Sequence, residues 1–463
     1  MRPQMWTLVA VMLGIFMLLL DVTIVVVALP NIQTSLGASF SDLQWTIDAY
    51  ALSLASLLLV SGSLADLYGR RRLFATGLVV FTLGSVACGA AQSAMMLVAF
   101  RALQGVGGAI MFATSLALIA HAFQGRERGM AFAIYGAVAG VSTALGPVLG
   151  GILTSTFGWQ SIFLVNLPIG IAAVIITMKY VEESKAPGQR KVDVPGFVVF
   201  TAGLVALIYG LISATERGWS DTRVMASLIG GGACLALFPI IEWKRAQPMF
   251  DLRLFKKPTF IGGALAAFGM NGSLYAMFIY LVLYLQKFKH YTTLETGGWL
   301  AFVTGATLIS AIVTGKIAHR VPVRILVGRG LLGVGVGLLV MRGITVESSA
   351  WHLVPGFIIA GIGSGFVNPA LASTAVGVVE PASSGMASGI NSTFRQVGIA
   401  TSIAALGSIF ASHRTGGPEA MTDGLNALLL VTVVIALVTG ALSLVLIRAK
   451  DFVQYGAKMP AME

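Results

Sequence analysis

The sequence predicts an all-α integral membrane protein, with two six-helix bundles and a central pair of additional membrane-spanning helices. Of its 463 residues, 56% are hydrophobic and only 11% are charged, whereas soluble domains carry about 25% charged residues. The mean hydropathy is +0.87. About fourteen apolar runs are long enough to cross a bilayer, which takes roughly 20 residues per helix. The chain is therefore interpreted as a multi-pass membrane protein.

The apolar segments fall into three groups along the chain. The first group lies near residues 6–29, 43–64, 73–91, 95–121, 130–154 and 162–181. The central pair lies near 194–213 and 224–243, and the last group lies near 259–285, 297–317, 325–341, 353–375, 386–411 and 425–447. Polar or basic linkers separate the groups. We expect a first bundle at 1–181, linkers with the additional pair at 182–258, a second bundle at 259–450, and a cytoplasmic tail at 451–463.

Basic residues gather in alternate loops, which indicates how the chain crosses the membrane. Loops of one parity hold clusters such as 70–72, 244–257 and 316–324, with roughly threefold more Lys and Arg than the other loops. Cytoplasmic loops are enriched in these residues, so both termini are expected in the cytoplasm and the number of spans is expected to be even. The net charge of +11 follows from this bias, and no nucleic-acid partner is expected. The cell membrane is the expected location.

Neither the cysteines nor the histidines form a pattern that binds a metal or performs catalysis. Cys88 and Cys234 lie in apolar segments without the spacing of a metal site or a disulfide framework. The histidines lie at segment ends or in loops, at positions 121, 290, 319, 352 and 413. We therefore expect no metal site, no cofactor and no enzymatic activity.

An acidic residue, Asp21, interrupts the first apolar segment. A charge at that depth costs ~3 kcal/mol or more unless it faces a polar cavity or is neutralised. At ~1.5 Å per residue, Asp21 and Arg101 of the fourth segment are expected at comparable depth in the outer half of the first bundle. Burial disfavours a charged carboxyl group, whereas a nearby arginine favours it. This conflict suggests that the pair exchanges protons; a fixed structural ion pair is the alternative.

A second acid, Asp48, lies near the outer end of the second apolar segment. It is expected only ~5 Å below Trp45, at a height comparable with the Asp21–Arg101 pair. Asp48 is a candidate substrate-binding residue. The alternative is a carboxylate at the membrane interface that merely touches water.

A loop motif that follows the second segment has a weak second copy in the last group of segments. Residues 62–71 contain Asp66, Arg70 and Arg71, and residues 315–324 repeat the glycine and the terminal arginine but carry His319 in place of Asp66. Parallel repeats of this kind are found in transporters whose two halves move about a central site. Asp66, Arg70 and Arg71 are therefore gating candidates, with a simple topological anchor as the alternative.

Glycines four residues apart mark the fifth segment, which also contains Gly146 and Pro147. Small residues let helices approach closely, and Pro147 weakens the hydrogen-bond ladder of its own helix. Helix packing explains this pattern without any further function.

In the last group of segments, no acidic residue is expected well inside a span. The candidate substrate-binding residues there are uncharged: Asn271, Tyr275, Asn368 and Asn391. Arg395 lies about ten residues inside its helix, with no acidic partner nearby in sequence. It is expected either to cap backbone carbonyl groups or to reach across to the first half.

Several of these stretches together resemble the major facilitator superfamily, and within it the fourteen-span drug–proton antiporter branch. Residues 20–30 resemble the first-helix signature of that branch, and residues 62–72 resemble the superfamily's loop motif. Further similar stretches are 97–108 with Arg101, 140–151 with Gly146 and Pro147, 159–170, and 385–398 with Arg395. The similarity covers nearly the whole chain.

The resemblance implies a secondary active exporter that expels amphipathic compounds in exchange for protons. Asp21 and Arg101 would couple the proton, which is the only coupling ion implied, and Gly146, Pro147 and Arg395 would take part in gating. Asp48 is similar to the second-helix acid of exporters of quaternary ammonium biocides. Some of those exporters also carry acids in the tenth or thirteenth helix, which this chain lacks, so monocationic or neutral substrates are favoured over dicationic ones.

Lipophilic drugs, protons and the lipid bilayer are thus the implied partners. A monomer is expected, and the need for a periplasmic adaptor is left open. Two alternative functions are a dedicated exporter of one endogenous metabolite or antibiotic, and a non-transporting membrane scaffold or sensor.

Overall fold

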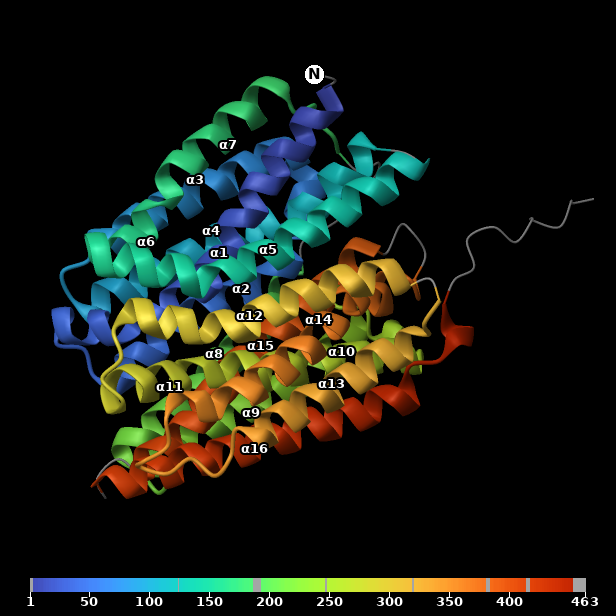
Figure 1. The fold of residues 1–463 in the computed structure, drawn as a ribbon. Coiled ribbons are helices and arrows are strands. Elements are labelled where there is room, and N and C mark those ends of the chain that lie inside the picture. Colours follow the sequence, from blue (N-terminus) through green and yellow to red (C-terminus); the bar gives the residue numbers. More distant parts are fainter. Residues whose placement is uncertain are drawn as a thin grey trace, which may run out of the picture.

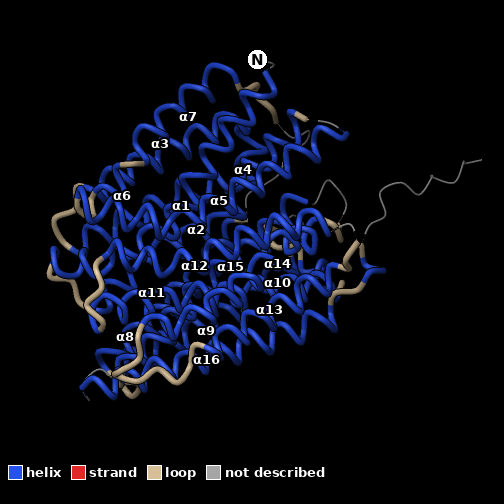
Figure 2. Tube along the Cα trace, viewed as in Figure 1, coloured by secondary structure: helices blue, strands red, loops and turns tan. Residues whose placement is uncertain are grey.

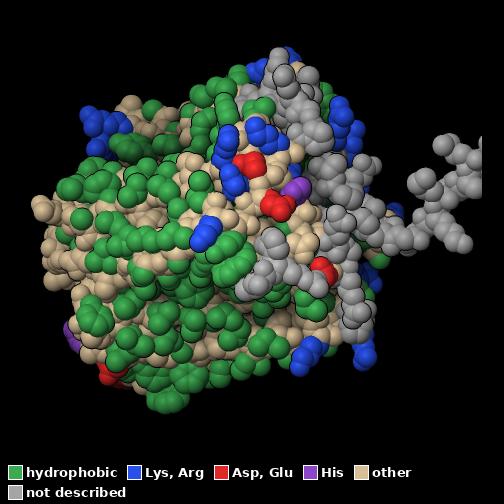
Figure 3. Space-filling model, turned by 90° about the horizontal axis from the view of Figure 1, so that it is seen from above, with side chains coloured by type: hydrophobic (Ala, Val, Ile, Leu, Met, Phe, Trp, Pro, Cys, Tyr) green, Lys and Arg blue, Asp and Glu red, His purple; other side chains and the backbone are tan. Residues whose placement is uncertain are grey.

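The computed structural model describes residues 3–123, 125–185, 193–245, 248–318, 320–379, 384–413 and 417–452. These residues form helices and connecting loops (Figure 2). The described residues form fourteen helical segments that are long and apolar enough to cross a membrane, and some of these segments contain more than one helix. The predicted all-helical membrane fold is therefore confirmed. Figure 3 shows one side of the molecule, on which hydrophobic side chains spread widely and charged side chains are sparse among them, as contact with lipid requires.

The first bundle contains the helices of the first six predicted spans. They are α1 (Pro3–Leu36), α2 (Phe40–Tyr68), α3 (Arg70–Gly89), α4 (Ala94–Ala122), α5 (Gly125–Phe157), α6 (Ser161–Leu164) and α7 (Asn166–Tyr180). The short helix α6 and helix α7 together make the sixth span.

The central pair consists of α8 (Val194–Arg217) and α9 (Thr222–Lys244), followed by the 3₁₀ helix η1 (Leu252–Lys256). Helix α8 packs into the same apolar cluster as α2 and α15 (Ser384–Ser412). Helix α9 lies directly on α8, because a Cβ atom at Gly231 would come within 2.7 Å of the Leu207 nitrogen. At the end of α9, the buried Glu242 accepts a hydrogen bond from the Phe250 amide at 3.0 Å. The pair is thereby tied to the linker that leads into the second bundle.

The second bundle begins with one long span that contains two π-helical turns. This span runs through α10 (Pro258–Met270), η2 (Asn271–Tyr275), α11 (Ala276–Leu283) and η3 (Tyr284–Phe288). The other helices are α12 (Thr293–Ile317), α13 (Val323–Val340), η4 (Ala350–Leu353), α14 (Val354–Val376), α15 and α16 (Gly417–Leu446), and η6 (Ala449–Asp451) follows. π-Helical turns often occur at functional sites, and η2 contains Asn271 and Tyr275, two of the predicted binding residues.

Several predicted helix boundaries differ from those in the structure, and three of them lie close to the residues of the site. Helix α1 continues through Pro30 to Leu36 instead of ending at residue 29. Helix α2 starts at Phe40 instead of residue 43, because Ser39 and Asp42 form a reciprocal capping box. Helix α3 starts at Arg70 instead of residue 73, because the linker carboxylate of Glu183 accepts hydrogen bonds from its first turn.

The two ends of the molecule are formed by different segments of the chain. The terminal face is the end where Trp6 stacks on Tyr180 and where Asp451 binds Thr259; both ends of the described chain lie there (Figure 1). The loop face is the opposite end, where α1 is joined to α2 and η3 to α12. Helices α5 and α12 lie together toward the loop face and diverge toward the terminal face (Figure 1).

The contacts between α5 and α12 show that the loop face is the closed one. A Cβ atom at Gly297 of α12 would lie 2.5 Å from the Pro147 carbonyl oxygen. Thr293 of α12 also donates to the Asn31 side chain of α1 at 2.9 Å. Because α5 and α12 diverge toward the terminal face (Figure 1), the bundles are sealed at the loop face and wider apart at the terminal face.

Candidate functional site

Asp21 and Arg101 form a buried ion pair between α1 and α4. The Arg101 Nη1 donates to Asp21 Oδ2 and also to Gln104 Oε1 at 2.8 Å. Gln104 Nε2 in turn donates to the other Asp21 oxygen, Oδ1, at 2.8 Å. The exposed fractions of Asp21, Arg101 and Gln104 are 0%, 1% and 0%. Both carboxylate oxygens of Asp21 are therefore compensated by donors.

The remaining side of the Arg101 guanidinium is also occupied. Its Nε donates to the carbonyl oxygen of Thr46 on α2 at 3.0 Å. The guanidinium carbon lies 4.3 Å from the ring centre of Tyr50 and 5.8 Å from that of Phe163, distances at which a cation is attracted to an aromatic face. Arg101 thus holds helices α1, α2, α4 and α6 together.

A polar chain extends from this pair to the sixth span. Gln104 Nε2 donates to Ser85 Oγ at 3.2 Å, and Asn166 donates to the same oxygen at 3.0 Å. The Ser85 hydroxyl then donates to the Phe163 carbonyl oxygen at 2.8 Å. Ser85 and Asn166 were not predicted as site residues, although any buried polar side chain in an apolar span requires a partner. All the members of this network belong to the first bundle.

Asp48 lies in a different place, at the seam, which is the boundary along which α2 of the first bundle faces α15 of the second. Helix α2 starts at Phe40, so Asp48 lies ~12 Å into the helix, and its exposed fraction is 0%. The interpretation as a carboxylate at the interface in contact with water does not fit this burial. Neither carboxylate oxygen has a hydrogen-bond partner among the described residues, and an uncompensated buried charge is costly. Asp48 is therefore, within the part of the chain that the structure describes, a buried carboxyl group without a hydrogen-bonding donor in this conformation.

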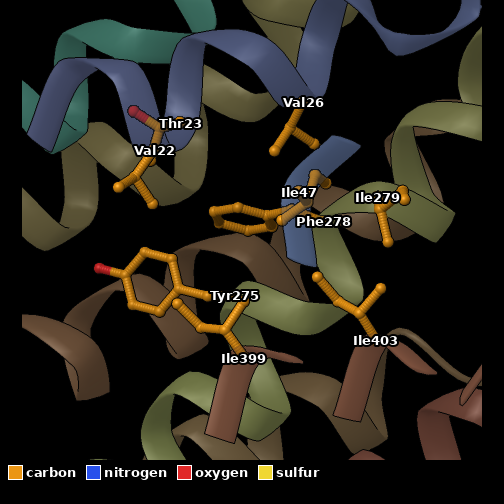
Figure 4. Close-up of a pocket in the computed structure, with 9 residues that line it drawn as sticks. All are labelled: Val22, Thr23, Val26, Ile47, Tyr275, Phe278, Ile279, Ile399 and Ile403. Carbon is orange, nitrogen blue, oxygen red and sulfur yellow. The ribbon is translucent and has the colours of Figure 1, made fainter. Parts of the chain in front are cut away.

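A small apolar cavity lies beside these helices, between the bundles (Figure 4). Its lining residues come from both halves of the chain: Val22, Thr23, Val26, Ile47, Tyr275, Phe278, Ile279, Ile399 and Ile403. Figure 4 shows the rings of Tyr275 and Phe278 facing the space between α1 and α15. The cavity measures about 20 Å³, roughly the room for one water molecule. In this conformation the cavity between the two bundles is therefore too small to hold a drug-sized molecule.

A second polar cluster lies in the second bundle and faces the first bundle. Asn368 on α14 lies 3.5 Å from the Tyr275 hydroxyl, and Arg395 on α15 donates to the Asn368 side chain at 3.4 Å. Arg395 is also close enough to Tyr135 of α5 for an electrostatic interaction. The structure thus brings together Tyr275, Asn368 and Arg395, and Arg395 does reach toward the first half.

The other two predicted binding residues make structural contacts. Asn271 donates to the Ala267 carbonyl of its own helix at 2.8 Å. Asn391 donates to the Gly263 carbonyl at 3.3 Å and so joins α15 to α10. Neither residue lines the cavity.

The predicted gating residues around Asp66 lie in a network at the terminal face. Arg70 pairs with Asp66 at 3.0 Å, one turn away. The Arg71 amide donates to Glu183 at 3.0 Å, and the Arg71 side chain donates to the Val181 carbonyl at 3.3 Å. Glu183 was not predicted, because it follows the sixth span and its proximity to α3 is a long-range contact. His319, in the second copy of the motif, lies outside the described residues.

Gly146 and Pro147 lie where α5 meets both α1 and α12. A side chain at Gly146 would collide with the hydroxyl of Thr23 on α1, and this hydroxyl lies 3.3 Å from the Thr143 carbonyl oxygen of α5. The Pro147 carbonyl faces Gly297 of α12. This pair of residues therefore allows the close approach that seals the loop face.

No group of three or more His, Cys, Asp or Glu side chains among the described residues could hold a metal ion. What the site offers instead is a compensated charge pair in one bundle, an uncompensated carboxyl group at the seam, and apolar walls from both bundles. This combination is that of a membrane transporter with a central pathway, in which buried ionisable groups mark ion and substrate routes.

Comparison with known proteins agrees with this class. The family model of the Major Facilitator Superfamily matches residues 11–403, and the chain belongs to this superfamily. It is 36% identical over 412 residues to the multidrug resistance protein Stp of Mycobacterium tuberculosis, covering 89% of this chain and 76% of Stp. It is 32% identical to the tetracenomycin C resistance and export protein of Streptomyces glaucescens, covering 89% of this chain and 77% of that protein.

The fold is also found in a solved structure. The human organic anion transporter MFSD10 superposes with a TM-score of 0.66 over 96% of this chain and 100% of that one, at 16% identity. At this identity the likeness concerns the fold alone. As a member of the Major Facilitator Superfamily with transporter relatives, the chain is a multi-pass membrane transporter rather than an enzyme.

Proposed function

We propose that this protein is a proton-coupled antiporter that exports amphipathic, monocationic or neutral compounds from the cytoplasm or the inner leaflet. The relatives described above include a multidrug resistance protein and an antibiotic resistance and export protein. The observation that carries the proposal is the Asp21–Arg101 pair, because ionisable groups inside a membrane span are costly to bury and commonly mark ion and substrate pathways.

In the proposed cycle the two bundles tilt to open one face at a time. The structure is sealed at the loop face, so a substrate would enter from the terminal face, between α5 and α12. Asp48 would release its proton and receive a cation as the seam opens, and Asp21 would gain and lose its proton beside Arg101. Tyr275, Asn368 and Arg395 would contact the substrate from the opposite side.

The driving force of this exchange follows from its charge balance. A membrane potential supplies about 2.3 kcal/mol per charge per 100 mV, and one pH unit supplies about 1.4 kcal/mol per proton. Exchange of one proton for one monocation moves no net charge. Export of a monocation would then depend on the pH gradient alone, whereas export of a neutral compound would use the potential as well.

The basic residues support a placement in the cell membrane with the terminal face in the cytoplasm. Arg70, Arg71, Lys257 and Arg448 belong to the segments at the terminal face, as the positive-inside rule requires of a cytoplasmic side. A monomer is the simplest assembly for this arrangement.

The decisive experiment measures proton release from the purified protein on addition of substrate, with a panel of lipophilic cations and neutral drugs. A coupled antiporter releases protons when a substrate displaces them. Absence of release with every compound, in protein that binds at least one of them, would refute proton coupling.

A second candidate function is the export of one endogenous metabolite. The relative that confers resistance to and exports tetracenomycin C favours it. The same panel discriminates the two functions, because a dedicated exporter would respond to one chemical series only, whereas a multidrug exporter would respond to unrelated lipophilic compounds.

A further inference from the structure

Three side chains on one face of α2 lead from the loop face down to Asp48. Phe40, Gln44 and Asp48 follow each other at intervals of four residues, so they line up along the helix. The facing helix α15 presents Phe410, Gly407 and Ile403 at matching spacing. Gln44 Nε2 donates to the Ile403 carbonyl at 2.9 Å, and a side chain at Gly407 would collide with Gln44. These two rows of residues, the α2 stripe and the α15 stripe, are therefore in direct contact along the seam between the bundles.

Three aromatic rings close the outer end of this seam. The Phe40 ring centre lies 5.7 Å from that of Phe410 and 6.4 Å from that of Tyr280 on α11. The rings of Tyr280 and Phe410 are 5.4 Å apart, so each ring contacts the other two. The Tyr280 hydroxyl also donates to the Ile403 carbonyl, the acceptor already used by Gln44. Asp48 is close enough to Tyr280 for an electrostatic interaction.

A hollow of about 320 Å³ lies on the outer side of the rings. Phe40 belongs to its lining, together with Gln33, Ala38, Ser39, Ser41, Thr215, Glu216 and Ala411. Ser41 of α2 donates to the exposed carboxylate of Glu216 on α8, so an acidic group stands at the rim. The hollow lies open at the surface, and Phe40 separates it from the buried end of the seam.

We propose that Phe40, Tyr280 and Phe410 form the outer gate that closes Asp48 off from the loop face, and that the hollow beyond them receives a lipophilic cation as it leaves. The direction of release rests on the proposed export function; the gate itself does not. When the bundles part at the loop face, the rings separate and expose Asp48. Aromatic faces attract cations, and Glu216 offers the next negative charge along the route.

The gate is tested by the access of a reagent to position 48. Cys88 and Cys234 are replaced by alanine and Asp48→Cys is introduced, so that a membrane-impermeant methanethiosulfonate added at the loop face reports on position 48 alone. Phe410→Ala should speed the labelling by about tenfold, which corresponds to an opening that is ~1.4 kcal/mol easier. Phe357→Ala is the matched control, since Phe357 is a buried ring of the same bundle that belongs to neither stripe.

The outcomes separate the gate from the transport function. An unchanged labelling rate in Phe410→Ala, or a rise equal to that of Phe357→Ala, overturns the gate, as does a rise that appears only with reagent at the terminal face. If Phe410→Ala does not yield folded protein, Phe410→Leu makes the same comparison with the apolar volume largely kept. Labelling needs no transport, so a chain that moves no protons would refute the antiporter and still give the labelling result. In the native background, Phe410→Leu should slow export of lipophilic cations more than that of neutral compounds.

Discussion

The guanidinium group of Arg101 donates to the carboxylate of Asp21, although 80 residues separate the two in the chain. Gln104 completes the pair by binding both partners. All the groups that compensate these charges come from the first bundle. The charge pair can therefore move as part of one bundle without losing a partner to the other.

Asp21→Asn should abolish proton-coupled export while the protein still folds. The amide is neutral at every pH and can still accept from Arg101, so the exchangeable proton is lost, while the Arg101 charge that is left without a carboxylate lowers the stability. The measurement is drug-driven proton flux in proteoliposomes with an imposed pH gradient. Asp42→Asn, which changes the side chain that accepts from the Ser39 amide at the exposed start of α2, is the control and should transport normally. Full coupled export by Asp21→Asn would contradict the role.

Arg101→Met should lower the stability by about 3 kcal/mol, because it leaves Asp21 as an unpaired buried charge. Adding Asp21→Asn to the same chain should recover most of that loss, since the unpaired charge is then gone. Thermal unfolding of the four proteins in detergent gives the coupling between the two sites. Strictly additive losses would show that the two side chains do not act as a pair.

Asp48→Asn should impair export of cationic substrates more than export of neutral ones. A neutral amide can no longer balance a positive charge at the seam, whereas neutral drugs need only the apolar walls. Export of one cationic and one neutral compound of similar size is compared in the same vesicles. Equal losses for both compounds would argue against Asp48 as the cation site.

Gly297→Ala should keep the loop face from sealing. The new methyl group would lie 2.5 Å from the Pro147 carbonyl oxygen, whereas a Cβ atom at the neighbouring Gly298 meets nothing within 4 Å. Gly298→Ala is thus a matched control with an identical chemical change. In the background that carries Asp48→Cys and lacks Cys88 and Cys234, the rate of labelling from the loop face should rise in Gly297→Ala only. The same labelling in both variants would mean that the contact between α5 and α12 does not hold this face closed.

Glu183→Ala should destabilise the start of α3 by about 1 kcal/mol, the usual cost of losing a helix cap. Glu183 accepts from the Arg71 and Arg72 amides at 3.0 and 3.3 Å, whereas the adjacent Glu182 is exposed. Glu182→Ala should therefore leave the melting temperature unchanged. Hydrogen exchange of the α3 amides locates the effect, and equal protection in both variants would rule out the cap.

The number, order and grouping of the spans follow from the sequence, because membrane spans are defined by length and hydropathy alone. The closeness of Asp21 and Arg101 also follows, since both are costly polar groups at similar depth. The depth of Asp48 does not: it depends on where α2 begins, and the Ser39–Asp42 capping box adds a turn before the apolar run. Glu183 and Gln44 act through residues of distant segments, which the pattern of a single span cannot indicate.

Proline 30 lies inside α1, at the level where this helix touches the second bundle. Gln286 donates to the Val27 carbonyl at 2.9 Å, and Thr293 binds the Asn31 side chain, one residue beyond the proline. Pro30 has no amide hydrogen, so the helical hydrogen bond to the Val26 carbonyl oxygen is missing, and the helix bends most easily at that point. Helix α1 can therefore flex near Pro30, so that its last turns, which carry Asn31, need not move as one rigid rod with the longer part that carries Asp21.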